Sequence, residues 1–169
     1  MDPLFPNYIY VPWKAEYVRR RKKFEGCLIC ALIDGSDSDL MCYEIGRNDH
    51  FFVFLNIFPY NPGHLMISTI KHYEKYNELS DEEKFGLAKM IGNSLEVLSE
   101  AYQTEDFNVG FNQGAFSGGS IRHLHVHIVP RYRTEMNFLE IIGKTRALIE
   151  SLEQTAAHLL PYAEKLCKL

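Results

Sequence analysis

The stretch "RHLHVHIVPR", residues 122–131, places His123, His125 and His127 at alternate positions among aliphatic residues. A period of two predicts a strand with one apolar face and with all three imidazoles on the other face. About 13 Å would separate His123 from His127 along such a strand, whereas zinc holds its ligands at about 2 Å. The three histidines therefore cannot all bind one ion. We expect them to have different roles, such as binding a metal, binding a phosphate or taking part in a reaction.

The segment before this strand, "NQGAFSGGS" at residues 112–120, is a glycine-rich loop. Its glycines leave backbone N–H groups free to approach an anion, and Ser120 adds a hydroxyl. A neutral imidazole beside a bound phosphate can attack phosphorus and form a nucleotidyl-histidine. The loop next to the histidine row therefore indicates phosphate chemistry more strongly than a glycine-rich loop alone.

The composition is that of one soluble globular domain, with 169 residues, of which 46 % are hydrophobic and 24 % charged. A net charge of −4 argues against generic nucleic-acid binding. No apolar run approaches the ~18 residues that span a membrane, and no signal peptide is evident. Four cysteines without a signal peptide favour a reducing cytoplasm. The basic run 19–23 fits a solvated helix face or a phosphate-steering patch.

The chain is expected to alternate between short strands and a few helices. The expected strands are residues 41–46, 51–57, 64–70, 106–112 and 122–130. A short helix from Cys27 should stop at Gly35, and a helix of about 23 residues should follow the capping box of Ser80 and Glu83. The tail from about residue 138 is also expected to be helical, with a disturbance at Pro161.

These elements predict one α+β domain over residues 1–169, with a five-stranded antiparallel sheet and two main helices. Residues 1–26 are expected to form an N-terminal extension, residues 27–137 the core and residues 138–169 a helical tail. The long helix should cover one face of the sheet.

"HLHVHIV" matches the pattern of the histidine triad (HIT) family at every position, and the chain resembles that family well beyond this heptad. "LNIFPYNPGHLMIS" is similar to its earlier strand-loop-strand, and "NQGAFSGGSIRH" to its phosphate loop. The ends of the chain resemble bacterial diadenosine tetraphosphate hydrolases or phosphorylases. The resemblance implies a HIT-like fold, a homodimer with joined sheets, and cleavage of adenosine-containing dinucleoside polyphosphates through a nucleotidyl-histidine.

The same resemblance implies catalytic roles for individual residues. His125 would be the nucleophile, and His127 would bind and place the phosphate. His64 would orient the triad through its first member, His123. Ser120 would lie near the leaving group.

The resemblance also implies substrate contacts. Asn56 would hold the ribose hydroxyls, Phe54 and Ile57 would flank the base, and Ile29 would complete that pocket. Without the family context, core packing is an equally good interpretation of Phe54 and Ile57.

Asn112, His127 and Ser120 would contact the phosphates. Gly119 stands where many family members carry Gln, so a side chain available to phosphate is missing. This departure leaves the fine substrate preference open.

Cys27 and Cys30 form a C-x-x-C pair that by itself fits a redox pair, half a zinc site or no function. Some members of the resembled family bind zinc through this pair and two histidines, which correspond here to His72 and His123. The result would be a closed Cys₂His₂ structural site that competes with His64 for influence on His123. Cys42 and Cys167 have no evident partner.

Three rival functions can be compared with the motifs. A Hint-like adenosine phosphoramidase and a nucleotide-binding interaction module with little turnover both fit the motifs. A cupin-like metalloenzyme that uses the whole triad as ligands does not, because the triad is too long for one ion. The sequence does not distinguish hydrolase from phosphorylase, nor does it give the preferred base or phosphate chain length.

Overall fold

The computed structural model describes residues 26–133, 142 and 148–169. The chain divides into two compact units, Met1–Glu25 with Arg133–Ala147, and Gly26–Tyr132 with Leu148–Leu169. All the helices and strands that the structure describes belong to the second unit. The basic run 19–23, nearly all of the expected N-terminal extension and the start of the expected C-terminal helix lie outside the described residues.

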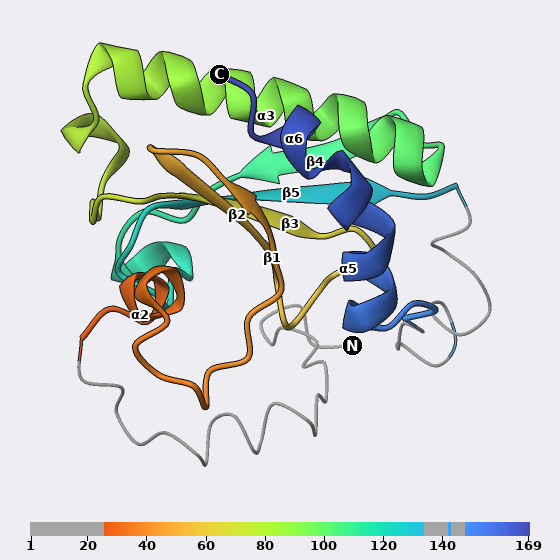
Figure 1. The fold of residues 1–169 in the computed structure, drawn as a ribbon, viewed down its shortest axis with the longest axis horizontal. Coiled ribbons are helices and arrows are strands. Elements are labelled where there is room, and N and C mark those ends of the chain that lie inside the picture. The colour runs from red at the N-terminus through yellow and green to blue at the C-terminus, as the bar shows by residue number, and fades with distance from the viewer. Residues whose placement is uncertain (1–25, 134–141, 143–147) are drawn as a thin grey trace, which may run out of the picture. The chain divides into compact units, whose positions relative to one another are not determined.

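The described residues form one antiparallel sheet of five strands, as the sequence predicts (Figure 1). Its strands are β1 (Glu44–Arg47), β2 (Phe51–Leu55), β3 (Leu65–Thr69), β4 (Asp106–Gly110) and β5 (His125–Arg131). They lie in the order β1-β2-β3-β5-β4, so that β5 lies between β3 and β4, and β1 and β4 are the two edge strands.

The helix α3 (Asp81–Tyr102) covers one face of this sheet (Figure 1). It begins with the predicted capping box, in which the Glu83 N–H donates to the Ser80 hydroxyl and the Ser80 N–H donates to the Glu83 carboxylate. Its buried residues include Leu87, Met90 and Leu98, which belong to one apolar core with the inward-facing side chains of the strands. The predicted long helix is therefore confirmed.

The helix α2 (Leu28–Asp34) lies on the opposite side of the sheet from α3 (Figure 1). It ends at Gly35, whose left-handed φ of 61° closes the helix as predicted. A second, smaller apolar cluster on this side contains Ile29, Phe52, Phe54 and Met66.

The C-terminal segment contains α5 (Leu152–Leu159), the 3₁₀ turn η3 (Leu160–Tyr162) and α6 (Ala163–Leu166). Pro161 lies in the 3₁₀ turn, so the predicted disturbance of the helical tail is confirmed. This segment contacts α3 and β1. None of the helices in residues 26–133 and 148–169 has the length and apolar character needed to cross a membrane.

On the sheet face opposite α3, the strand register aligns residues of neighbouring strands in rows that run across the sheet. Phe54 pairs with Met66, Met66 with His127, and His127 with Gly110, so one row crosses four strands. The neighbouring row contains Ser68 opposite His125.

The strand β5 begins at His125, whereas the expected strand began at residue 122. His123 therefore precedes the strand, and the backbone N–H of Leu124 donates to the Tyr73 carbonyl instead of joining the ladder. The His123 side chain is therefore not aligned with those of His125 and His127 along the strand.

Candidate functional site

The hydrogen bonds around His125 define which of its ring nitrogens carries the proton. Its Nδ1 lies 2.6 Å from the backbone carbonyl oxygen of His123, which can only accept. Nδ1 is therefore the N–H donor, and the neutral ring keeps Nε2 unprotonated. Burial lowers the pKa of His125, which favours this neutral form.

A hydrogen bond between His64 and His127 fixes the tautomers of both rings. The backbone N–H of Tyr60 donates to His64 Nδ1 at 3.1 Å, so the proton of the neutral His64 ring lies on Nε2. This Nε2 lies 3.0 Å from His127 Nδ1 and donates to it. His127 consequently carries its own proton on Nε2, where it forms a donor for an anion.

The expectation that His64 acts through the first triad histidine is wrong, because His64 contacts the third. The antiparallel register explains the difference. Leu65 pairs with Ile128 and Ser68 with His125, so the end of β3 next to His64 lies beside residues 127–129. His123 precedes the other end of β5, four residues from His127 or about 13 Å of extended chain.

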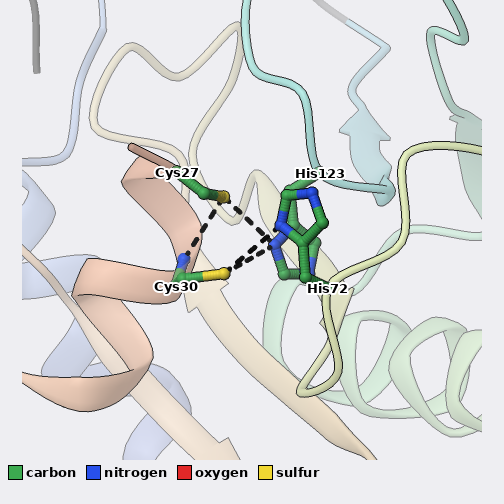
Figure 2. A group of neighbouring side chains, drawn as sticks. All are labelled: Cys27, Cys30, His72 and His123. Atoms are coloured by element: carbon green, nitrogen blue, oxygen red, sulfur yellow. Dashed lines mark hydrogen bonds between the residues drawn. The ribbon is translucent and has the colours of Figure 1, made fainter. Parts of the chain in front are cut away.

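Cys27, Cys30, His72 and His123 converge from the start of α2 and from two loops (Figure 2). Their ligand atoms all lie within 4.8 Å of one another. His123 Nδ1 is 3.3 Å from the Cys27 Sγ and 3.5 Å from the Cys30 Sγ, and His72 Nδ1 is 3.4 Å from the Cys30 Sγ. A tetrahedral ion with ordinary bond lengths would separate sulfur and nitrogen ligands by about 3.6 Å. The four side chains therefore could hold a metal ion.

The ring of His123 is oriented for this role by Thr69. His123 Nε2 lies 2.8 Å from the Thr69 carbonyl oxygen and donates to it, which leaves Nδ1 unprotonated toward the two sulfur atoms. A ligand histidine is commonly fixed in this way through its other nitrogen. Burial and the neighbouring Cys27 raise the pKa of Cys30 to about 11, so a cation is required to hold both thiolates.

Desolvation keeps the remaining site histidines neutral. Burial and the neighbouring His127 lower the pKa of His64 to about 3. Burial, with smaller contributions from nearby histidines, lowers the pKa of both His123 and His127 to about 4. At neutral pH His64, His123 and His127 are therefore uncharged imidazoles with defined tautomers.

In the glycine-rich loop, Gly119 lies close to Asn112, one of the residues expected to contact phosphate. A Cβ added at Gly119 would lie 3.3 Å from the Asn112 carbonyl oxygen and 3.4 Å from the Asn112 Cβ, so the loop folds back on itself. Asn112 and Ser120 are both exposed. The close approach also gives a physical reason for Gly119, because any larger residue would force the loop to shift.

The residues expected to bind the nucleoside are brought together only in part. Phe54 and Ile29 pack in one cluster with Met66. Ile57 is half-buried and is not among the described side chains that pack on this cluster. The Asn56 Oδ1 accepts the Phe58 N–H at 2.9 Å, which fixes the loop after β2 and leaves the amide NH₂ available.

The sequence interpretation missed two backbone groups that fix ring orientations, the Thr69 carbonyl and the Tyr60 N–H. Neither leaves a side-chain signal, since every residue but proline carries both groups. Only the register of β3 against β5 could have indicated them.

The fold and the histidine arrangement define a class, and comparison with known proteins identifies it. A model of the HIT domain family matches residues 40–134, and the chain belongs to the HIT family. Among curated relatives, "AP-4-A phosphorylase" of Mycobacterium tuberculosis is 36 % identical over 112 residues, 66 % of this chain and 57 % of that protein. The chain thus matches little more than half the length of that relative. "Adenosine 5'-monophosphoramidase hnt1" of Schizosaccharomyces pombe is 28 % identical over 64 % of this chain and 77 % of its own.

A solved structure described as a Zn-bound histidine triad family protein from Mycobacterium smegmatis shares the fold. Its TM-score is 0.66 at 22 % identity, and the match covers 83 % of this chain and 93 % of the other. The predicted family and fold are therefore confirmed.

Acid should destabilise the fold through His64, because its folded pKa of about 3 lies below the ordinary value of 6.5. Below pH 6.5 His64 binds a proton in the unfolded chain but stays neutral in the folded chain. The free energy of unfolding should therefore fall as the pH drops toward 3. The slope approaches about 1.4 kcal/mol per pH unit for one proton. Urea unfolding of the metal-saturated protein at several pH values should show a steeper decline for the wild type than for His64→Gln. The exposed control His50→Gln should keep the wild-type slope, and a wild-type slope in His64→Gln would contradict this assignment.

Proposed function

We propose that this protein cleaves dinucleoside polyphosphates, such as diadenosine tetraphosphate, through a nucleotidyl-histidine on His125. The observation that carries the proposal is the 2.6 Å contact between His125 Nδ1 and the His123 carbonyl. It leaves Nε2 as an unprotonated nucleophile at neutral pH, as attack on phosphorus requires. The matching relative named for AP-4-A phosphorylase supports the same reaction class.

The proposed reaction has two displacements. In the first, the Nε2 lone pair of His125 forms a bond to the α-phosphorus, and the bond between this phosphorus and the bridging oxygen breaks. The nucleoside polyphosphate leaves with the bonding electron pair. In the second, an oxygen of water or of inorganic phosphate forms a bond to the same phosphorus, and the P–N bond breaks with its electron pair returning to His125 Nε2. An attacking water loses a proton to solvent, the mononucleotide or a nucleoside diphosphate is released, and His125 is neutral again.

His127 and His64 are proposed to manage charge during these steps. The Nε2–H of His127 suits a hydrogen bond to a phosphate oxygen or the bridging oxygen, where negative charge develops. His64 supports that donor through its own N–H to His127 Nδ1, 3.0 Å away. Ser120 and Asn112 are proposed to add neutral donors from the exposed loop, Ser120 near the leaving group.

The first nucleoside is proposed to bind over β2 and β3. Phe54 belongs to the apolar cluster on that part of the sheet, and Ile29 packs there from α2. The free amide of Asn56 is proposed to hold the ribose, and Ile57 to border the base. An apolar surface with a few polar groups at its edge is typical of nucleotide sites.

Zinc is the metal proposed for the Cys27, Cys30, His72 and His123 site. Two thiolates and two imidazoles form the closed tetrahedral set that zinc prefers over hard cations such as magnesium. A bound zinc would supply structural cross-linking between α2 and the segment that precedes β5. The described cysteines are all free thiols, which fits a reducing, cytoplasmic location for the protein.

A homodimer joined through β4 completes the proposal. β4 is one of the two edge strands of the sheet, with β1 at the other edge, and its outer edge has no strand partner among the described residues. Val109 on this strand is 43 % exposed. Pairing of two such edges would remove an aggregation-prone feature from both copies.

Product analysis tests the reaction, with His125→Asn as the decisive variant. Diadenosine tetraphosphate should yield AMP and ATP when water is the acceptor, or ADP and ATP when phosphate is the acceptor. His125→Asn should lower turnover by about a thousandfold or more because the covalent step is lost. Acid-quenched mass spectrometry of the wild type should locate an AMP adduct on His125. The control His50→Asn should retain full turnover.

Three results would contradict this account. One is substantial turnover by His125→Asn, and another is an adduct on His123 or His127. The third is turnover of an adenosine phosphoramidate with none of diadenosine tetraphosphate, which would favour the phosphoramidase function of the yeast relative.

The metal site is tested by composition and stability. The purified protein should contain about one zinc per chain. Cys27→Ser should release the metal and lower the melting temperature, because metal binding is coupled to folding. Cys42→Ser removes an exposed cysteine outside the site and should change neither quantity. Protein that is prepared without chelators and lacks stoichiometric metal would exclude the zinc assignment.

A further inference from the structure

A pocket of about 350 Å³ lies on the triad face of the sheet, between β5 and β4. Its lining includes His127 and Asn112, which the proposed reaction already uses, and continues to Asn108 and Arg131. Asn108 and Arg131 have no role in the reaction proposed above. Its volume lies within the range of small-molecule sites.

The strand register places this pocket and the proposed nucleoside site on opposite sides of the catalytic histidines. The row Phe54, Met66, His127 and Gly110 crosses β2, β3, β5 and β4 in order. Three strand spacings of about 4.8 Å give this row a length of about 14 Å. The apolar cluster occupies the end of the row at Phe54, and the pocket begins at His127.

The chemistry of the pocket suits a phosphate chain. Arg131 is permanently charged and presents several N–H donors, and the amides of Asn108 and Asn112 add neutral donors. Among the described residues that line the pocket there is no carboxylate. Asp106 pairs with Arg131 in the strand register but does not belong to the lining.

The pocket also offers an aromatic surface. Tyr60 lines it, is 58 % exposed and lies with its ring 6.4 Å from that of His127 at an interplanar angle of 25°. Aromatic rings in such positions accept stacked bases without regard to base identity.

Gly110 keeps the floor of the pocket open. A Cβ built there meets no atom within 4 Å, and its φ lies outside the left-handed region. A larger side chain at Gly110 would therefore fit the backbone and extend into the pocket.

We propose that this pocket binds the leaving half of the substrate, namely the distal phosphates and the second nucleoside of a dinucleoside polyphosphate. This inference rests on the proposed function and deepens it. The distal phosphates would contact Arg131 and Asn108, and the second base would stack on Tyr60. When the bond to the α-phosphorus breaks, the departing nucleoside polyphosphate already lies in the pocket with its electron pair on the terminal oxygen. The pocket thus selects dinucleotides over AMP conjugates with small leaving groups.

The decisive experiment narrows the pocket and compares two substrates. Gly110→Leu is assayed with diadenosine tetraphosphate and with adenosine 5'-phosphoramidate, whose leaving group is only ammonia. Its kcat/KM for the dinucleotide should fall about tenfold more than its kcat/KM for the phosphoramidate. Arg131→Gln, a second variant that leaves the pocket open, should show the same preference for the phosphoramidate with a raised KM for the dinucleotide.

Gly92→Leu is the matched control, because a Cβ at this exposed glycine of α3 also meets no atom within 4 Å. It should leave the ratio of the two kcat/KM values unchanged. Equal losses on both substrates in Gly110→Leu, or no loss on either, would overturn the proposal. Gly110→Leu should also keep the oligomeric mass of the wild type in light scattering, because the pairing proposed for β4 joins backbone edges and leaves the pocket face uncovered. A changed mass would overturn the proposal, since the pocket would then belong to the contact between copies.

A binding measurement separates failure of this inference from failure of the proposed function. Calorimetric titration of the turnover-deficient His125→Asn protein should give tighter binding of diadenosine tetraphosphate than of AMP. Adding Gly110→Leu should remove that difference. The difference should appear even if the wild type proves to be a binding module. Equal affinities for the two ligands in the single variant would exclude the subsite.

Discussion

The hydrogen bond from His125 Nδ1 to the carbonyl of His123 is the constraint on which the proposed chemistry of this protein depends. A free imidazole exchanges its proton between two nitrogens, and only one arrangement presents a nucleophile to phosphorus. A backbone carbonyl cannot donate, so it fixes the proton on Nδ1 without adding a charge. Because the acceptor belongs to the residue two positions earlier, the position of His123 determines the position of the proposed nucleophile.

His123 is itself held from three directions. Its Nε2 donates to the Thr69 carbonyl, its Nδ1 faces the two cysteines, and its own carbonyl accepts from His125. The candidate metal site and the proposed nucleophile are therefore joined by one residue and a single hydrogen bond. On the other side, His64 fixes His127 in the complementary tautomer, with its N–H on Nε2. In the proposed function, His123 would be a metal ligand, His125 the nucleophile and His127 a hydrogen-bond donor to phosphate.

Much of this arrangement could be predicted because it depends on local pattern. The alternation in β5, the capping box at Ser80 and the closing glycine at Gly35 each reflect interactions within a few residues. The candidate metal ligands were found through family resemblance, since Cys27 and His123 are 96 positions apart and no local pattern links them. Resemblance did not give the partner of His64, because that depends on the register of β3 against β5. It also did not give the start of β5, where Leu124 bonds to Tyr73 and turns His123 out of the strand.

The central claim concerns proton positions, and nitrogen NMR of the histidine rings measures them directly. Long-range ¹H–¹⁵N spectra of the ¹⁵N-histidine-labelled, metal-loaded protein at neutral pH distinguish the two neutral tautomers from each other and from imidazolium. We predict a neutral His125 ring with its proton on Nδ1, together with His64 and His127 rings that carry theirs on Nε2. A His125 ring protonated on Nε2, or charged at neutral pH, would contradict the account.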